Sequence, residues 1–180
     1  MNLVRPLFVA VIITVLARAI SYSSPRVDIE LDPTDFALGG YRIHVGYIQN
    51  SIRYDVGILS VKIPKLFHGN DRFDYEISGV VARMDYLFAA YPKWFVGLEG
   101  TWLKNVYTHL PTNVSETRHP FLLATRIGYR FVFMDRLTVT PWVGLGALLN
   151  KGNEYVIIED DRFEVPTFNV FPTVHVGWAF

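Results

Sequence analysis

Ionisable side chains recur at every second position in several segments of the chain. Arg42 and His44 are separated by one residue, as are Arg53 and Asp55. A period of two places such residues on one face of an extended strand. A charged face of this kind can conduct ions, bind a charged substrate or form a structural network of ion pairs. The candidate residues on this face are Arg42, His44, Arg53, Asp55, Arg83, Asp85, Glu99, Arg126, Arg130 and His175.

The balance of charge on this face favours the structural network. Five arginines are matched there by six acids, because Asp28, Glu30 and Asp32 join the acids already named. Charges in a narrow enclosed space are costly unless they are paired. We therefore predict a network of ion pairs, with an ion or substrate path as the alternative. Counting residues from the predicted turns gives three contacts: Arg83 with Glu99, His44 with Asp55, and Arg126 with Trp142 through a cation–π contact.

Candidate catalytic residues are few. An enzyme needs a nucleophile with a base within reach. The segment His68-Gly69-Asn70-Asp71, with Ser78 nearby, is the nearest approach to such a group. His109 and His119 lack an obvious partner in the sequence. We predict no catalytic residue.

Candidate metal ligands are equally sparse. The chain has no Cys, so thiolate sites and disulfides are absent. His175 with Asp28 or Glu30 could form a ligand pair, but a hydrogen-bonded histidine is the simpler interpretation. The acidic run Glu159–Asp161 could bind calcium or bridge to lipopolysaccharide, but a solvated loop is the better prediction. We predict no metal and no cofactor.

The N-terminus has the pattern of a targeting segment. Arg5 lies in a short basic region, Leu7–Leu16 is apolar, and Ala17 and Ala19 are small residues before a cut. The sequence thus predicts a cleavable signal peptide over residues 1–19, with a cut as late as residue 23 as the alternative. Lys+Arg and Asp+Glu both number 17, so no positive excess points to nucleic acid.

After residue 25 the dominant pattern is alternation with a period of two, which is typical of strands. One domain over residues 26–180 is the natural interpretation. The even number of segments suits a closed antiparallel barrel, so the predicted fold is an all-β, eight-stranded, up-and-down transmembrane barrel. The eight predicted strands are Arg26–Asp32, Gly39–Tyr47, Ser51–Ile63, Tyr75–Phe88, Lys93–Tyr107, Pro120–Phe133, Arg136–Leu149 and Phe168–Phe180.

The second face of these strands is almost wholly apolar, and alternation alone does not say which face is inside. A soluble ligand-binding barrel turns the apolar face inward, whereas an outer-membrane barrel turns it toward lipid. Small and charged residues fill a narrow lumen well, which favours lipid outside. Aromatic residues also gather at strand ends, as in an interfacial girdle: Tyr47, Tyr86, Phe88, Trp94, Tyr129, Phe131, Trp178 and Phe180.

The connections alternate in length, which also favours a membrane barrel. Residues 48–50, 89–92 and 134–135 form short turns, and the remaining connections are longer and polar. Short periplasmic turns opposite long external loops are the usual asymmetry of these barrels, so we expect both termini in the periplasm. Pro141 and Pro172 lie inside predicted strands, and we expect local bulges there.

The last seven residues, Val174-His175-Val176-Gly177-Trp178-Ala179-Phe180, resemble the terminal strand of small eight-stranded bacterial outer-membrane barrels. In that class the terminal aromatic strand is the signal read by the barrel-assembly machinery, which implies that role for Val176, Trp178 and Phe180. Lipid-A deacylases of this architecture carry a His-x-Ser pair, which this chain lacks. The class includes adhesins, enzymes and channels, and the fold does not choose among them.

The sequence therefore predicts a porin-like Gram-negative outer-membrane barrel with a charge-plugged lumen. We expect it to be non-enzymatic and monomeric, and to act through its external loops or by supporting membrane integrity. Its expected partners are outer-membrane lipid, lipopolysaccharide and the assembly machinery, with no nucleic acid. A lipid-modifying barrel enzyme and a narrow channel are the alternatives.

Deletion of Phe180 is expected to block assembly rather than to weaken a folded barrel, because the resemblance makes this residue part of the assembly signal. The measurement is the level of heat-modifiable protein in isolated outer membranes. Normal levels of the deleted chain would contradict the assignment.

Overall fold

The computed structural model describes residues 25–88 and 94–180. The predicted signal peptide over residues 1–19 and the predicted turn at Ala89–Pro92 lie outside the described residues. Among those described, no helix combines the length and apolar character needed to cross a membrane.

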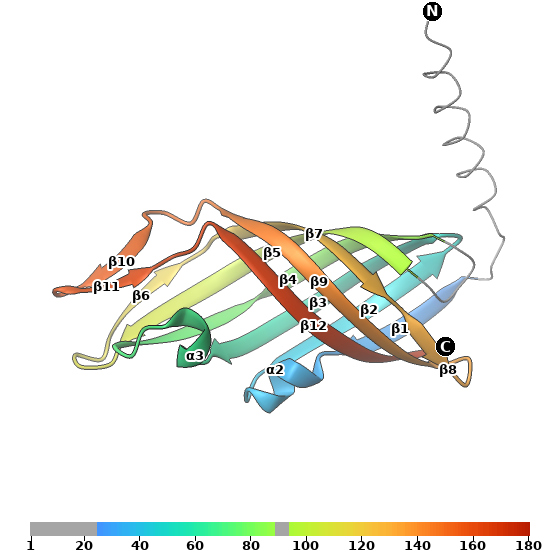
Figure 1. Cartoon of the computed structure of the whole chain (residues 1–180), viewed down its shortest axis with the longest axis horizontal. Helices are drawn as coiled ribbons and strands as arrows, with labels where there is room; N and C mark the ends of the chain where they lie inside the picture. Colours follow the sequence, from blue (N-terminus) through green and yellow to red (C-terminus); the bar gives the residue numbers. More distant parts are fainter. Residues whose placement is uncertain (1–24, 89–93) are drawn as a thin grey trace, which may run out of the picture.

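Eight antiparallel strands form a closed ring, which confirms the predicted fold class (Figure 1). Each strand pairs with its neighbours in the ring, and the first strand pairs with the last. Closure leaves the ring without the long exposed edges of an open sheet. In chain order the ring strands are β1 (Arg26–Leu31), β2 (Tyr41–Gln49), β3 (Ile52–Ile63), β4 (Phe73–Leu87), β5 (Trp94–His109), β7 (Phe121–Tyr129), β9 (Leu137–Leu149) and β12 (Phe168–Ala179).

The connections carry short elements of their own, which were expected only as loops. At one end of the barrel, Figure 1 shows the hairpin of β10 and β11 projecting beyond the ring, beside β6. The short helices α2 and α3 join β1 to β2 and β3 to β4. The bounds of these elements are α2 (Pro33–Ala37), α3 (Lys65–His68), β6 (Val114–Arg118), β8 (Phe131–Phe133), β10 (Tyr155–Ile158) and β11 (Asp161–Glu164).

Tight turns connect consecutive strands at the opposite end of the barrel. Asn50 has a φ of 57°, and Met134 and Asp135 have φ values of 51° and 61°. Positive φ at the centre of a two-residue turn matches the right-handed twist of the flanking strands. The described short turns therefore lie at one end and the long connections at the other, as the sequence predicts.

The expected bulges at Pro141 and Pro172 are absent. Pairing of β9 with β12 keeps one register from Leu137 opposite Trp178 to Ala147 opposite Phe168. The N–H of Phe180 bonds to Val27 across the seam, whereas the N–H of Ala179 bonds toward β9. The backbone N–H groups of even-numbered residues in β12 thus point toward β1 rather than toward β9. Pro172, which lacks an N–H, therefore removes no bond from the β9 ladder.

The N–H that Pro141 lacks would point away from β12, toward the other neighbour of β9, which is β7. The partner of Pro141 on β12 is Val174, an even-numbered residue whose own N–H points away from β9. The missing donor of Pro141 therefore faces β7. The strand there is interrupted at Arg130, between β7 and β8, although both pieces pair with β9 in the same register. The sixth predicted strand is accordingly two pieces.

The seam between β1 and β12 is short. Four residue pairs join the two strands, from Asp28 opposite Ala179 to Leu31 opposite Val176, and the bond from Phe180 to Val27 extends the pairing by one residue beyond β12. Beyond the seam the chain turns into α2, whose N-cap is Asp32. The hydroxyl of Thr173 on β12 donates to Asp32 Oδ2 at 2.6 Å. This contact ties α2 to the part of β12 that β1 does not reach.

The apolar face of the barrel points outward and the charged face points inward, as the sequence predicts. The outward side chains of Val56, Val80 and Leu98 are 60%, 61% and 51% exposed. Asp28 and His44, by contrast, are fully buried. An outer surface of this kind suits hydrocarbon rather than water.

The pattern reverses along β4 toward the long-connection end. Met84 and Val80 face outward near the short turns, but Glu76 faces outward farther along the same strand. On the inner face Arg83 gives way to Val81 and Phe73, both fully buried. One strand thus has an apolar outside over part of its length and an apolar inside beyond it, which indicates two different surroundings.

Leu98→Arg is expected to destabilise the barrel by about 2–4 kcal/mol, because it places a charge on the lipid-facing surface at mid-strand. Thr117→Arg is the matched control, since Thr117 is also exposed but lies on β6 beyond the ring. Urea titration in lipid vesicles provides the measurement. Equal stability of the two variants would mean that the outer surface is not lipid-facing.

Candidate functional site

The interior near the short turns is filled by a network of buried ion pairs. Arg53 lies at its centre, where its Nη2 is 2.7 Å from Asp28 Oδ1 and 2.8 Å from Asp55 Oδ2. The same Nη2 is 3.1 Å from Glu30 Oε2. Arg130 also binds Asp28 and Glu30, at 2.6 Å from Asp28 Oδ2 and 2.5 Å from Glu30 Oε1. Asp28 and Glu30 on β1 each bridge two arginines. Side chains therefore tie β1 across the lumen to Arg53 on β3 and to Arg130, which lies between β7 and β8.

A second group of pairs surrounds Trp142. As the hairpin count predicts, Arg83 lies opposite Glu99, and its Nε donates to Glu99 Oε2 at 2.6 Å. Arg126 lies 3.1 Å from Asp85 through Nε. The guanidinium groups of Arg83 and Arg126 lie 5.0 and 4.3 Å from the Trp142 ring centroid. The predicted Arg126–Trp142 contact is thus present, and Arg83 shares the ring.

Two histidines stack beside these pairs. The rings of His44 and His175 are 5.1 Å apart and nearly parallel. Each donates its Nδ1 proton to a carboxylate, His44 to Asp55 at 2.8 Å and His175 to Glu30 at 3.3 Å. Both rings are fully buried. Their contacts are those of hydrogen-bonded core histidines.

The register predicted for His44 is wrong. His44 lies opposite Gly57, and Asp55 lies opposite Gly46, a shift of two residues. The turn is centred on Asn50 and Ser51 rather than one residue earlier. A Cβ at Gly57 would collide with the imidazole of His44, so the glycine makes room for the ring. The two side chains still meet, but along a diagonal.

Arg42 lies at the margin of the network. It pairs with Asp35 of α2 at 2.8 Å, an acid that the sequence pattern did not single out. Burial raises the pKa of the Asp35 carboxyl, and the charge of Arg42 opposes that rise. Arg42 therefore helps to hold α2 against the barrel.

The interior beyond the ion pairs is an apolar core, which the sequence pattern did not predict. Phe163 of the β10–β11 hairpin inserts into it and lies 5.0–5.7 Å from the rings of Phe73, Tyr75 and Tyr107. Tyr75 and Tyr107 stack face to face at 4.8 Å. The core residues are Leu59, Phe73, Val81, Leu103, Tyr107, Leu148, Val156, Ile158, Phe163 and Val165.

Ion pairs fasten the hairpin over this core. Asp161 Oδ2 is 2.8 Å from both Arg72 Nε and His109 Nε2, and His109 Nδ1 is 2.7 Å from the hydroxyl of Thr112. His109 thus has partners that the sequence did not reveal. The hydrogen bonds from His109 and Arg72 lower the pKa of Asp161. The group ties three long connections together, and we call Arg72, His109 and Asp161 the hairpin clasp.

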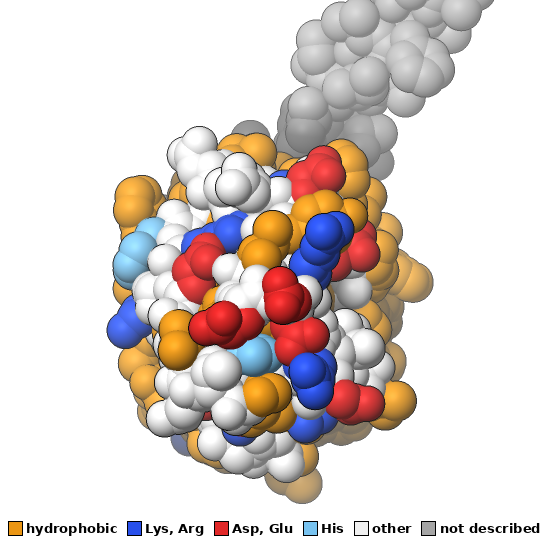
Figure 2. Space-filling model, turned by 90° about the vertical axis from the view of Figure 1, so that its left-hand side faces the viewer, with side chains coloured by type: hydrophobic (Ala, Val, Ile, Leu, Met, Phe, Trp, Pro, Cys, Tyr) orange, Lys and Arg blue, Asp and Glu red, His pale blue; other side chains and the backbone are white. Residues whose placement is uncertain are grey.

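The end of the barrel that carries the hairpin is closed and mixed in charge. Figure 2 shows acidic and basic side chains interspersed over this end, with no open mouth. Among the described residues no three His, Cys, Asp or Glu side chains form a metal-binding group. The His68 region likewise brings no nucleophile to a base: His68 packs on Phe163 and Tyr75 instead.

Comparison with known proteins identifies the fold but no family. No family model and no curated protein matches the chain. Three solved structures are similar: the N-terminal β-barrel domain of Pseudomonas aeruginosa OprF (TM-score 0.50, 10% identity, 86% of this chain and 97% of that chain), Neisserial surface protein A (0.53, 14%, 86% and 94%), and a major outer membrane protein from Thermus thermophilus (0.54, 10%, 88% and 100%). The resemblance to the small outer-membrane β-barrels is thereby confirmed at the level of the fold.

Glu99→Gln is expected to destabilise the barrel by up to about 3–5 kcal/mol, because the buried Arg83 loses its nearest carboxylate and keeps only the more distant Asp55 at 3.8 Å. Arg83→Gln combined with Glu99→Gln should restore part of the loss, because the remaining charge is also removed. Urea titration of both variants is the test. A Glu99→Gln barrel as stable as the parent would show that water reaches Arg83 and replaces the lost carboxylate.

Asp161→Asn is expected to loosen the β10–β11 hairpin at neutral pH, measured as faster trypsin cleavage at Arg162. Because the pKa of folded Asp161 lies below its ordinary value, the clasp is complete above that ordinary range and is lost as the pH falls through the folded pKa. Wild-type hairpin exchange, followed by hydrogen–deuterium exchange, should therefore accelerate at acid pH, and the variant should lose this dependence. An unchanged cleavage rate would show that the hairpin clasp does not hold the hairpin in place.

Proposed function

We propose that the protein is a non-enzymatic barrel of the bacterial outer membrane with a sealed lumen, acting through its external surface or by supporting membrane integrity. The apolar outer surface and closed ring support the location, since a spanning sheet needs both. Both termini and the short turns then face the periplasm. The predicted signal peptide and terminal aromatic strand fit delivery to that membrane by the assembly machinery.

The observation that carries the proposal is a double seal of the interior. Near the short turns, Arg53 and Arg130 are paired to buried acids. Toward the other end, Phe163 and the surrounding apolar core fill the barrel. A permeating ion would have to break the first seal and be desolvated by the second. What remains available for function is the external end, formed by α3, β6 and the β10–β11 hairpin.

Planar-bilayer recording with heat-modifiability in outer membranes tests this proposal. The wild-type barrel should insert, show altered mobility when boiled, and give no steady conductance. A variant with residues 154–165 replaced by a short Gly-Ser linker should also stay closed, because the ion-pair seal remains. Steady conductance in the wild type would favour a channel.

Lipid analysis separates the enzymatic alternative. Overexpression of the wild-type protein should leave the mass spectrum of lipid A and phospholipids unchanged. A new acylated or deacylated species would favour an outer-leaflet enzyme. Recovery of the mature protein in the soluble periplasmic fraction would contradict the membrane location itself.

A further inference from the structure

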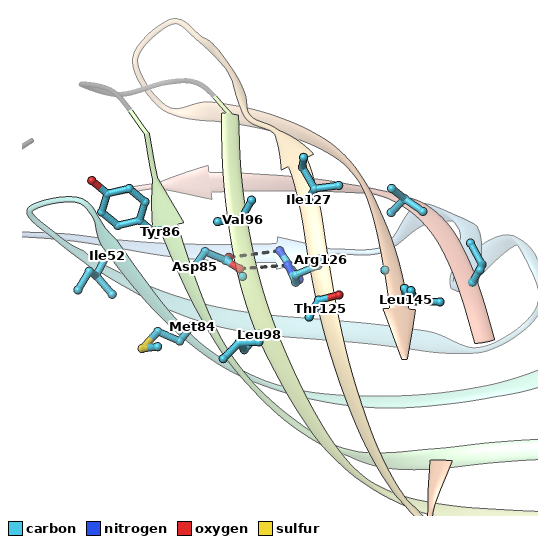
Figure 3. Close-up of a pocket in the computed structure, with 14 residues that line it drawn as sticks. Ile52, Met84, Asp85, Tyr86, Val96, Leu98, Thr125, Arg126, Ile127 and Leu145 are labelled. Atoms are coloured by element: carbon cyan, nitrogen blue, oxygen red, sulfur yellow. Dashed lines mark hydrogen bonds and ion pairs between the residues drawn. The ribbon is translucent and has the colours of Figure 1, made fainter. Parts of the chain in front are cut away.

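The outer wall of the barrel is hollowed on one side. The hollow has room for about 800 Å³ and crosses β4, β5, β7 and β9, from Ile52 on β3 to Val170 on β12. A volume of this size falls within the usual range of small-molecule sites. Figure 3 shows Met84, Val96 and Leu98 among the side chains that line it.

Side-chain size explains where the hollow lies. Trp94 and Trp102 both project from β5 and are 56% and 63% exposed. Their eight-residue separation corresponds to roughly 26 Å along an extended strand. The outward residues between them, Val96, Leu98 and Gly100, are much smaller. The hollow occupies the part of this stretch nearer Trp94, because its lining on β5 includes Val96 and Leu98 but neither indole.

The lining carries no charge that an occupant could meet. Asp85 and Arg126 belong to the floor, but their side chains turn into the lumen and pair with each other there (Figure 3). Both are at most 3% exposed. Thr125 supplies a hydroxyl in an otherwise aliphatic and aromatic surface. An occupant has to be apolar along its whole length.

The hollow lies toward the short-turn end of the apolar surface. The pairing places Val96 beside Tyr86 and Ile127, one row from Trp94 beside Tyr129. Trp94 and Tyr129 meet edge to face at 5.3 Å, one row beyond the lining residues Val96 and Ile127. Aromatic residues of this kind lie at the level of lipid headgroups. With the short turns in the periplasm, the nearest lipids are the phospholipids of the periplasmic leaflet.

We infer that this hollow binds one acyl chain of a periplasmic-leaflet phospholipid, with Trp94 and Tyr129 at the glycerol level. The inference rests on the proposed outer-membrane location. Lipid tails are as apolar as this surface, so removal from water contributes nothing, and the attraction comes from van der Waals packing of one chain into a groove that is already formed.

Native mass spectrometry of barrels extracted from membranes in mild detergent tests the inference. Wild-type protein should retain a single phospholipid adduct, and Thr125→Trp, which places an indole inside the hollow, should lower its abundance several-fold. Val45→Trp is the matched control, because Val45 is 47% exposed on β2, outside the hollow. The control should retain the lipid as the wild type does.

Three results would overturn the site. The first is a wild type without a retained phospholipid, and the second is equal loss from Thr125→Trp and Val45→Trp. The third is disulfide-linked dimers of Thr125→Cys in phosphatidylethanolamine–phosphatidylglycerol vesicles but not of Val45→Cys, which would make the hollow a contact between copies. The chain has no native Cys, so each engineered thiol is alone. Heat-modifiability of every variant is measured first, so that failure to insert counts against the proposed function and lipid loss alone counts only against the hollow.

Discussion

Hydrocarbon offers a peptide group no hydrogen-bond partner, and this constraint governs the whole structure. Strands can satisfy it only by pairing on both sides, so eight of them close into a ring. Closure fixes which side chains face inward, because neighbours along a strand point in opposite directions. The narrow interior then receives charged residues such as Arg53 and Asp55, and these have to neutralise one another. The ion-pair network is thus a consequence of building a wall from paired strands.

The change of pattern along β4 shows where on the barrel the constraint imposed by hydrocarbon would stop applying. Where Met84 and Val80 face outward, the outer wall is apolar, and Arg83 is inside. Where Glu76 faces outward, the outer wall is polar, and the interior becomes a conventional apolar core around Phe163. The same strand is therefore part of two packing regimes. Hairpin β10–β11 is needed only in the second, where an apolar interior would otherwise be open to water.

Sequence periodicity predicts the ring because each strand is long enough for alternation to stand out. It misses features that depend on short segments or distant partners. The β10–β11 hairpin is too short to show a period, and His109 and Asp161 are separated by 52 residues. The predicted register of His44 is wrong because the position of a turn decides which residues lie opposite one another. The predicted bulge at Pro141 is absent because the strand facing its missing donor is interrupted at Arg130, so β9 keeps one register with β7 and β8.

Because the seam is short, the barrel resists mechanical force less on that side than on the others. β1 is joined to β2 along six residue pairs but to β12 along only four. A load applied to the N-terminus therefore acts on the smallest ladder in the ring. The arginine pairs of Asp28 and Glu30 cross the lumen to β3 and to Arg130, and the seam itself is bridged by the contact of Glu30 with His175 on β12. Peeling would begin there and would leave the β3–β4–β5 wall intact. The molecule is strongest on the side whose strands are longest and weakest where its first and last strands meet.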